Sequence, residues 1–197
     1  MTSEPHIKIP CLLGTSRPGS YTGKALSVVV DELAKDPDVS VTVIDPSELE
    51  LNFPGRGSDA GAVGMVESVK AATGLVLATT EYHGSFSAMM KLMIENLGFP
   101  SVMAGKPVAL LGVAAGRIGA IKSLEQLRGV CSHVGAIVLP GPVSVAGVQG
   151  VFDDDGHITD PAIDRQIRGV AKGLRDYIGH AICPAYSLEA LVREKVG

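Results

Sequence analysis

The chain has 197 residues, of which 46% are hydrophobic and 19% are charged, and its formal net charge is −4. Its length and composition predict one globular domain with a substantial core, and they exclude a disordered chain. The absence of a basic run argues against nucleic acid and anionic membranes as partners, and no apolar run approaches the roughly 20 residues that span a bilayer.

Apolar runs alternate along the chain with segments of helical period. Two of these runs, at 74–79 and 107–114, are apolar on both faces, as parallel strands covered by helices on each side require. The alternation predicts a doubly wound α/β fold, in which helices cover both faces of a five-stranded parallel sheet. The strands are predicted at residues 7–13, 39–45, 74–79, 107–114 and 135–140, and the helices near residues 22–35, 59–72, 87–97, 119–133 and 160–182.

The connections contain turn-forming residues and no linker. Residues 52–61 are predicted to be a loop, and residues 151–160 a short hairpin. We therefore expect a single domain over residues 1–183. The tail at 184–197 is compatible with either a short docked helix or an arm.

The ligand site of such a sheet is expected outside the carboxyl ends of the strands, where the strand order reverses. For the five-strand order 2-1-3-4-5, this point lies between strands one and three. The loops that follow strands one, three and four therefore carry the candidate site. They read GTSRPGSYT, TTEYHGSFS and AAGRIGA.

The first of these loops offers hydroxyl groups, backbone N–H groups at a helix start and one guanidinium, a set suited to one phosphate. Its glycine spacing is that of a triphosphate-binding loop, but the lysine that follows the second glycine there is missing. We predict a monophosphate site, with a plain strand-to-helix turn as the alternative. The candidate ligands are Thr15, Arg17, Ser20 and Thr22.

The other two loops carry weaker signals. Tyr82 can pack against a planar ring, and Gly84 lets the backbone approach a ligand closely. His83 is a candidate proton donor, although a solvated loop histidine is the commoner case. In the third loop, small residues leave room for a flat ligand, and Arg117 is either a contact for a second anion or a surface residue.

Taken together, these loops resemble the NADPH-dependent FMN reductase family, a flavodoxin-like group that includes quinone, azo-dye and chromate reductases. Residues 14–22 read GTSRPGSYT where the family has approximately G-S-x-R-x-G-S-x-N. Residues 80–85 read TEYHGS where it has P-E-Y-N-G-S, with Lys91 downstream. The resemblance covers roughly residues 8–178. The chain departs from the family at Thr22, Thr80 and His83, which replace Asn, Pro and Asn.

The resemblance implies a flavoprotein oxidoreductase that uses FMN and NADPH. NADPH would pass a hydride to FMN and leave before a quinone, flavin, azo compound or metal oxyanion takes the electrons, in a ping-pong mechanism. No catalytic side chain is expected to be essential, and His83 is a candidate modulator of the flavin. The first loop would hold the FMN phosphate. The ring would be bordered, chiefly through backbone groups, by Glu81, Tyr82, His83 and Gly84 on one edge and by Gly116, Arg117 and Gly119 on the other.

The predicted helix at 87–97 is apolar around most of its circumference, which predicts burial on two sides and hence a subunit interface. The resemblance likewise implies a homodimer or homotetramer with the flavin near that interface. The interface is predicted to include Met89, Met93 and Leu97. The alternative is that the flexible methionines fill the core of the subunit.

The three cysteines are odd in number, widely spaced and free of any C-x-x-C pair, so we expect no disulfide framework and no metal site. We interpret them as reduced thiols of a cytoplasmic protein. The start of the chain has too short an apolar stretch for a secretory signal. Two other functions stay open. One is a non-enzymatic flavodoxin-like electron carrier or flavin-binding regulatory protein, and the other is a flavin-free protein that binds a phosphate ligand. Preference for NADPH over NADH is likewise undecided.

Overall fold

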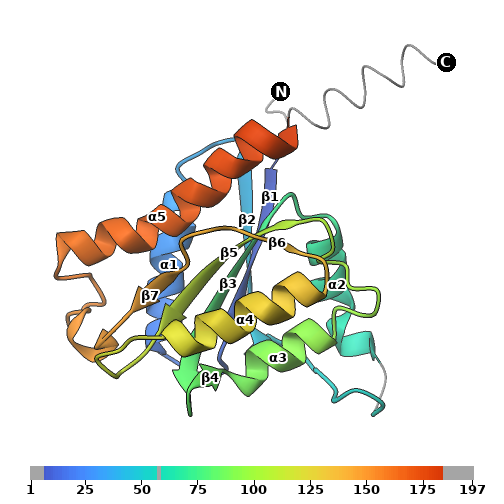
Figure 1. Ribbon diagram of the computed structural model, residues 1–197, viewed down its shortest axis with the longest axis horizontal. Helices are drawn as coiled ribbons and strands as arrows, with labels where there is room; N and C mark the ends of the chain where they lie inside the picture. The colour runs from blue at the N-terminus through green and yellow to red at the C-terminus, as the bar shows by residue number, and fades with distance from the viewer. Residues whose placement is uncertain (1–6, 57–58, 184–197) are drawn as a thin grey trace.

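The computed structural model describes residues 7–56 and 59–183 and contains one central parallel sheet. The strand order is β2-β1-β3-β5-β6, which corresponds to the predicted order 2-1-3-4-5 (Figure 1). The predicted doubly wound fold is therefore confirmed. The strands on this path are β2 (Val39–Ile44), β1 (Ile7–Gly14), β3 (Leu75–Tyr82), β5 (Pro107–Val113) and β6 (Ile137–Val138).

Two further strands bring the sheet to seven. β4 (Ser85–Phe86) pairs with β3 in antiparallel orientation, and β7 (Val143–Val145) pairs with β5 in parallel. β6 lies within the fifth strand predicted at 135–140, whereas β7 lies beyond that range and continues along the same neighbour, β5. The segment between them reads Pro-Gly-Pro at 140–142. Proline has no N–H to donate to a ladder, and the strand is interrupted there.

Helices cover both faces of the sheet. One face packs against α1 (Tyr21–Leu33) and α5 (Pro161–Tyr177). The other packs against α2 (Val63–Lys70), α3 (Ala88–Glu95) and α4 (Ile121–His133) (Figure 1). Short turns of 3-10 helix lie at η1 (Pro46–Glu48), η2 (Asp59–Ala62) and η3 (Val148–Gly150), and a π-helical turn, η4 (Ile178–Ile182), extends α5. Among the described residues, no helix has the length and apolar character needed to cross a membrane.

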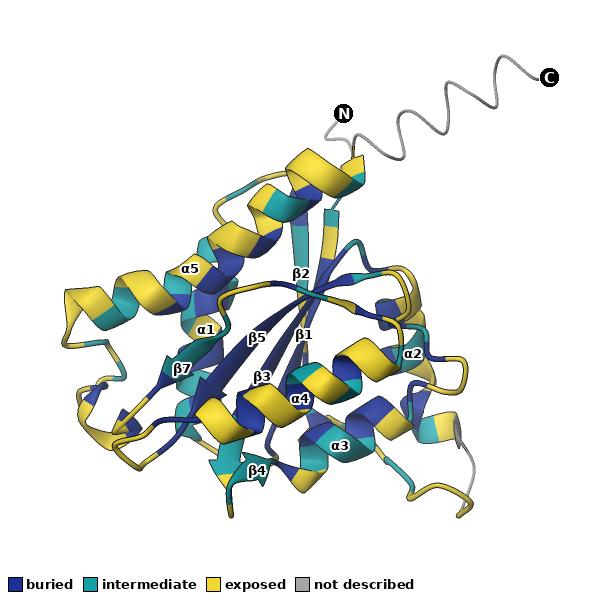
Figure 2. Ribbon diagram, in the orientation of Figure 1, coloured by how far each residue is buried: buried dark blue, intermediate teal, exposed yellow. Residues whose placement is uncertain are grey.

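The central strands are buried on both faces, as predicted from their continuous apolar runs (Figure 2). Successive side chains of β1 alternate between the two layers, so that Ile9 and Cys11 pack towards α1 and α5 while Leu12 packs towards α3 and α4. Burial raises the pKa of the Cys11 thiol to about 12, and that of the Cys131 thiol likewise. Both cysteines are therefore inert core residues at neutral pH.

Met93 and Leu97 have no exposed surface and belong to the core of the subunit itself. The prediction that these two residues form a subunit interface is therefore wrong. These additional apolar side chains of α3 pack inside the subunit, in a buried cluster that also contains Met65 from α2 and Met103 from the loop after α3. Met89 is partly buried against this cluster.

The segment before α5 forms the predicted hairpin turn. Phe152 and Ile158 make an antiparallel bridge, and Gly156 adopts a φ of 86° that favours glycine. The predictions for the tail at 184–197 concern residues outside the described part of the chain.

Candidate functional site

A cavity of about 430 Å³ opens where β1, β3 and β5 end. Since these strands are parallel neighbours, their carboxyl ends meet at one edge of the sheet. The volume lies in the range of small-molecule sites, roughly 300–1,000 Å³. The described residues that line it are Thr15, Arg17, Pro18, Gly19, Ser20, Tyr21, Thr22, Lys24, Thr80, Glu81, Tyr82, Val113, Ala114, Ala115, Val148 and Gln149.

Hydroxyl groups of the loop between β1 and α1 are oriented by backbone donors. The Thr15 Oγ1 accepts a hydrogen bond from the Arg17 N–H at 3.2 Å. The Ser20 Oγ accepts from the Gly23 N–H at 3.0 Å and so caps α1. A hydroxyl whose oxygen accepts in this way keeps its proton to donate. The loop therefore presents hydroxyl donors beside the N-terminus of a helix, where an anion is favoured.

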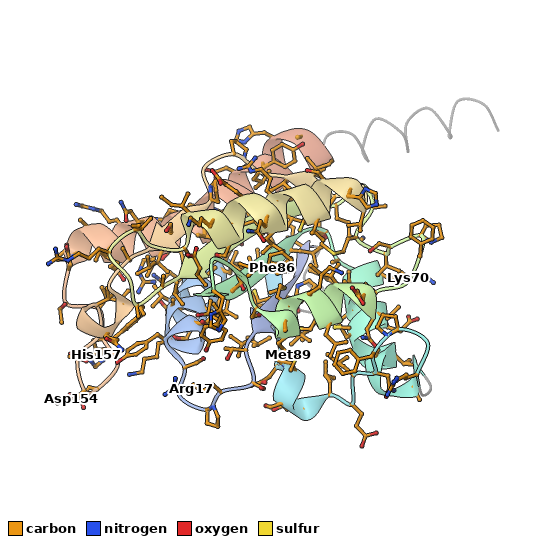
Figure 3. The ribbon with its side chains drawn as sticks, turned by 60° about the horizontal axis from the view of Figure 1, so that its bottom comes forward. Arg17, Lys70, Phe86, Met89, Asp154 and His157 are labelled. Carbon is orange, nitrogen blue, oxygen red and sulfur yellow. The ribbon has the colours of Figure 1, made fainter. Side chains whose placement is uncertain are left out.

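Thr22 adds a hydroxyl that has no partner among the described residues. The residue is only 2% exposed and lines the cavity, and no hydrogen bond within the described residues involves its side chain. Arg17 lies on the exposed loop before α1, with Asp154 and His157 on the neighbouring hairpin (Figure 3). Within residues 7–56 and 59–183, no carboxylate forms an ion pair with Arg17. The hydroxyl of Thr22 and the guanidinium of Arg17 are thus available to an anion.

β3, whose last residues line the cavity, ends in a two-residue hairpin turn. His83 has a φ of 52° and Gly84 a φ of 74°, the pair of left-handed residues that a type I′ turn between β3 and β4 requires. Histidine is one of the few non-glycine residues enriched in that region. This turn geometry accounts for His83 where the family has Asn.

Side-chain hydrogen bonds fix this hairpin to α4. The Glu81 carboxylate accepts from the Ser123 N–H at 3.1 Å. The Gln126 side chain bridges the turn, since its Nε2 donates to the Gly84 carbonyl at 3.0 Å and its Oε1 accepts from the Ser85 hydroxyl at 2.7 Å. One oxygen of the Glu81 carboxylate is thereby engaged by α4, and backbone groups and the half-exposed Tyr82 are available to a ligand.

The structure brings six of the eleven predicted site residues into the cavity wall, namely Thr15, Arg17, Ser20, Thr22, Glu81 and Tyr82. The other five, His83, Gly84, Gly116, Arg117 and Gly119, lie in the adjoining turns outside it.

Gly119 is explained by the fold. It has a φ of 78°, and a Cβ atom there would lie 2.4 Å from the Ser144 hydroxyl. The Gly116 carbonyl accepts from the N–H groups of Gly119 and Gly147, so this loop is fastened to the segment after β7. Arg117 is exposed. These glycines thus shape the loop behind the cavity.

Sequence reasoning did not assign four polar residues of the wall to the site, namely Tyr21, Lys24, Thr80 and Gln149. Gln149 lies in η3, the turn after the interrupted fifth strand, whose loop we did not include. The rule that we applied to strands one, three and four would have found Gln149 if we had also applied it to strand five. Lys24 lies in the first turn of α1, where a cation is disfavoured by the helix dipole. This unusual placement of a lysine is the feature of the sequence that could have indicated a role for Lys24 in the site.

Comparison with known proteins shows the family of this chain. The family described as NADPH-dependent FMN reductase matches residues 7–150. An NAD(P)H-dependent FMN reductase of Pseudomonas aeruginosa is 30% identical over 164 residues, which cover 78% of this chain and 85% of that protein. A 2-hydroxy-1,4-benzoquinone reductase of a Burkholderia species is 30% identical over 141 residues, 69% of this chain and 76% of that protein.

A solved structure shares the fold at low sequence identity. The flavoenzyme NAD(P)H:(acceptor) oxidoreductase of Paracoccus denitrificans aligns with a TM-score of 0.72 at 21% identity, covering 88% of this chain and 97% of that one. At this identity the likeness concerns the fold.

Proposed function

The chain belongs to the NADPH-dependent FMN reductase family, and we propose that it binds FMN in the cavity at the carboxyl ends of β1, β3 and β5 and reduces it with NADPH. The observation that carries the proposal is the hydroxyl cradle between β1 and α1. Its donors, with Arg17 beside them, match a phosphate monoester, and the Thr22 hydroxyl has no partner among the described residues.

The rest of the cavity suits a flat ring. Beyond the cradle, the wall is formed by the end of β3, at Thr80 and Tyr82, and by the small apolar residues Ala114 and Ala115 after β5. Because one oxygen of the Glu81 carboxylate is engaged by α4, we expect β3 to contact the ring chiefly through backbone groups. The hairpin anchored by Gln126 would keep them in a fixed position.

FMN, when bound, supplies two-electron chemistry, taking a hydride from NADPH and passing the electrons to an acceptor. The protein binds and orients the reactants and needs no nucleophile of its own. We assign the acceptor to the quinones, free flavins, azo compounds or metal oxyanions. We propose a ping-pong mechanism, in which the same open cavity admits NADPH first and admits the acceptor after the oxidised dinucleotide has left. The exposed Arg117 is the proposed contact for the dinucleotide.

The test is spectroscopic. The protein is purified with added FMN, separated from free flavin, and its visible spectrum is recorded before and after anaerobic addition of NADPH. We expect a bound flavin whose absorption is bleached by NADPH and restored by a quinone. A flavin that stays oxidised would favour a carrier or regulatory protein. A colourless protein that cannot be loaded with FMN would refute both.

We further propose a homo-oligomer, the state implied by the family resemblance. Since Met93 and Leu97 are core residues, its interface must use other apolar side chains, and Phe99 and Ile118 are among the most exposed. Light scattering coupled to gel filtration measures the mass. A monomeric mass across the micromolar range would contradict the proposal.

A further inference from the structure

We propose that Lys24 is a specificity-determining residue of the flavin site, and that its ammonium group selects the phosphorylated flavin over riboflavin. The inference rests on the proposed function, because it takes the flavin phosphate to lie in the cradle beside α1. It adds a residue that the motif of the first loop does not contain, since Lys24 lies inside α1.

Aromatic rings hold the Lys24 side chain in place. Its Nζ lies 5.4 Å from the centroid of the Tyr21 ring and 5.9 Å from that of Phe152, within the range of cation–π attraction. The two rings stack at 6.2 Å, and Phe152 is buried. Phe152 comes from the hairpin before α5, so a segment distant in the sequence braces the start of α1. The ammonium group is therefore positioned at the cavity.

The electrostatic surroundings of the Lys24 ammonium group favour the binding of an anion. A cation in the first turn of a helix faces the positive end of the helix dipole, and α1 has no acidic residue there to offset it. Within residues 7–56 and 59–183, no carboxylate forms an ion pair with Lys24. Lys35, just beyond the other end of the same helix, is by contrast paired with Asp31 and Glu32.

The neighbouring groups identify the anion as a phosphate. Thr22 supplies a hydroxyl that is almost fully buried and has no partner in the described protein, and Arg17 supplies a second cation in the same wall. A phosphate monoester carries between one and a half and two negative charges at neutral pH, which two cations can balance. Riboflavin ends in a neutral hydroxyl group and would gain little from Lys24.

The test compares the dissociation constants of FMN and riboflavin, measured from quenching of flavin fluorescence at low salt. Lys24→Met is expected to weaken FMN binding about tenfold, as loss of a charge-assisted contact does, and to change riboflavin binding by less than about twofold. Lys24→Arg keeps the charge and should keep the FMN preference. Lys35→Met, the matched control just beyond the other end of α1, should change neither constant. Phe152→Leu should weaken FMN selectively, because it removes one of the rings that position the ammonium group.

Salt supplies a second readout. Raising the ionic strength should weaken FMN binding more steeply in the wild type than in Lys24→Met. Thermal melts of the flavin-free proteins show whether each variant is folded, and Lys24→Gln serves in place of Lys24→Met if the latter is not.

The outcomes separate the inference from the proposed function. A wild type that binds FMN, together with Lys24 variants that keep its full FMN preference, would overturn the inference alone. An equal loss for both flavins would also overturn it, since Lys24 would then act by packing. A wild type that binds neither flavin would overturn the proposed function and the inference with it.

Discussion

The Glu81 carboxylate, at the end of β3, accepts a hydrogen bond from the Ser123 backbone N–H in the first turn of α4. α4 has Ala120 at its N-cap position and no side-chain cap from its own sequence. Glu81 therefore acts as the cap from another element and places a negative charge at the positive end of the helix. The same contact fastens the β3–β4 hairpin that forms one wall of the cavity.

Glu81→Ala is expected to lower the free energy of unfolding by about 1–2 kcal/mol, because an N-terminal N–H group loses its acceptor and the helix dipole its counter-charge. Glu81→Gln keeps an acceptor without the charge and should lose less. Urea unfolding measures both. Glu125→Ala removes an exposed carboxylate from the same helix and should change stability by less than about 0.5 kcal/mol. Equal losses in the three variants would contradict the capping role.

Gly14 is required by close packing at the end of β1. A Cβ atom at this position would lie 2.8 Å from the Ala78 carbonyl oxygen and 3.0 Å from the Met90 Cε. We expect Gly14→Ala to destabilise the protein by about 1–3 kcal/mol, the usual cost of overpacking a core. The measurement is the urea midpoint at constant m-value.

Gly129→Ala provides the matched control for Gly14→Ala. Gly129 lies within α4, and a Cβ atom there would meet open space. The same substitution should therefore stabilise the protein, by about 0.5–1 kcal/mol, since alanine is the better helix former. A Gly14→Ala protein as stable as the wild type would show that α3 moves to make room.

The conformation of His83 predicts its response to substitution. Because its φ is 52°, His83→Asn should be neutral or slightly stabilising, as asparagine suits the first position of a type I′ turn. His83→Val should cost about 1–2 kcal/mol, because a β-branched residue is disfavoured in the left-handed region. Thermal unfolding compares the two. Equal stability of both variants would mean that the hairpin adopts another turn.

Much of the site could be predicted from sequence, because strand ends and loop chemistry are local. The loop at 14–22 and the turn at 80–85 follow two strands whose apolar runs are unmistakable, and parallel strands bring their carboxyl ends together. Lys24 could not be placed in this way. Its position at the cavity depends on the Tyr21 and Phe152 rings, and Phe152 belongs to a hairpin whose packing no local pattern reveals.

The prediction for α3 failed for a different reason. Burial against a second subunit and burial inside the subunit leave the same apolar excess in the sequence, so periodicity cannot separate them. Met93 lies in a cluster with Met65 and Met103, residues from other parts of the chain. Only the three-dimensional packing shows that unbranched methionine side chains fill this space.

The ion pairs between α1 and α5 predict a loss of stability in acid. Arg168 donates to the Asp31 carboxylate at 2.5 Å and thereby lowers the pKa of that group. The pKa of Glu32 is lowered too, first by its hydrogen bond with Lys35 and also by that with Arg168. A carboxyl group whose pKa is lowered in the folded state stabilises the fold above its unfolded pKa of about 4, and this contribution is lost as the pH falls through the folded pKa.

Arg168→Met should therefore be less stable than the wild type above about pH 5, and the difference should shrink as the pH falls below about 4. Unfolding by urea at a series of pH values measures it, and high salt should reduce the difference at neutral pH. Arg165→Met, which removes an exposed arginine of the same helix, is the control and should show no such pH dependence. A constant difference from neutral pH down to pH 3 would mean that Arg168 acts through its aliphatic chain.

Substitution of Thr22 should change the affinity for FMN without changing the stability of the fold. Because its hydroxyl has no partner within the described protein, Thr22→Val should leave the stability of the flavin-free protein within about 0.5 kcal/mol of the wild type. FMN binding should weaken by about 10- to 150-fold, since a hydrogen bond to a charged phosphate is worth about 1.5–3 kcal/mol. Ser20→Ala should instead lower both the stability and the affinity for FMN. We expect a loss of about 1 kcal/mol in stability, because Ser20 also caps α1. Calorimetry for affinity and urea unfolding for stability distinguish the two variants, and a Thr22→Val protein that binds FMN as tightly as the wild type would remove Thr22 from the phosphate site.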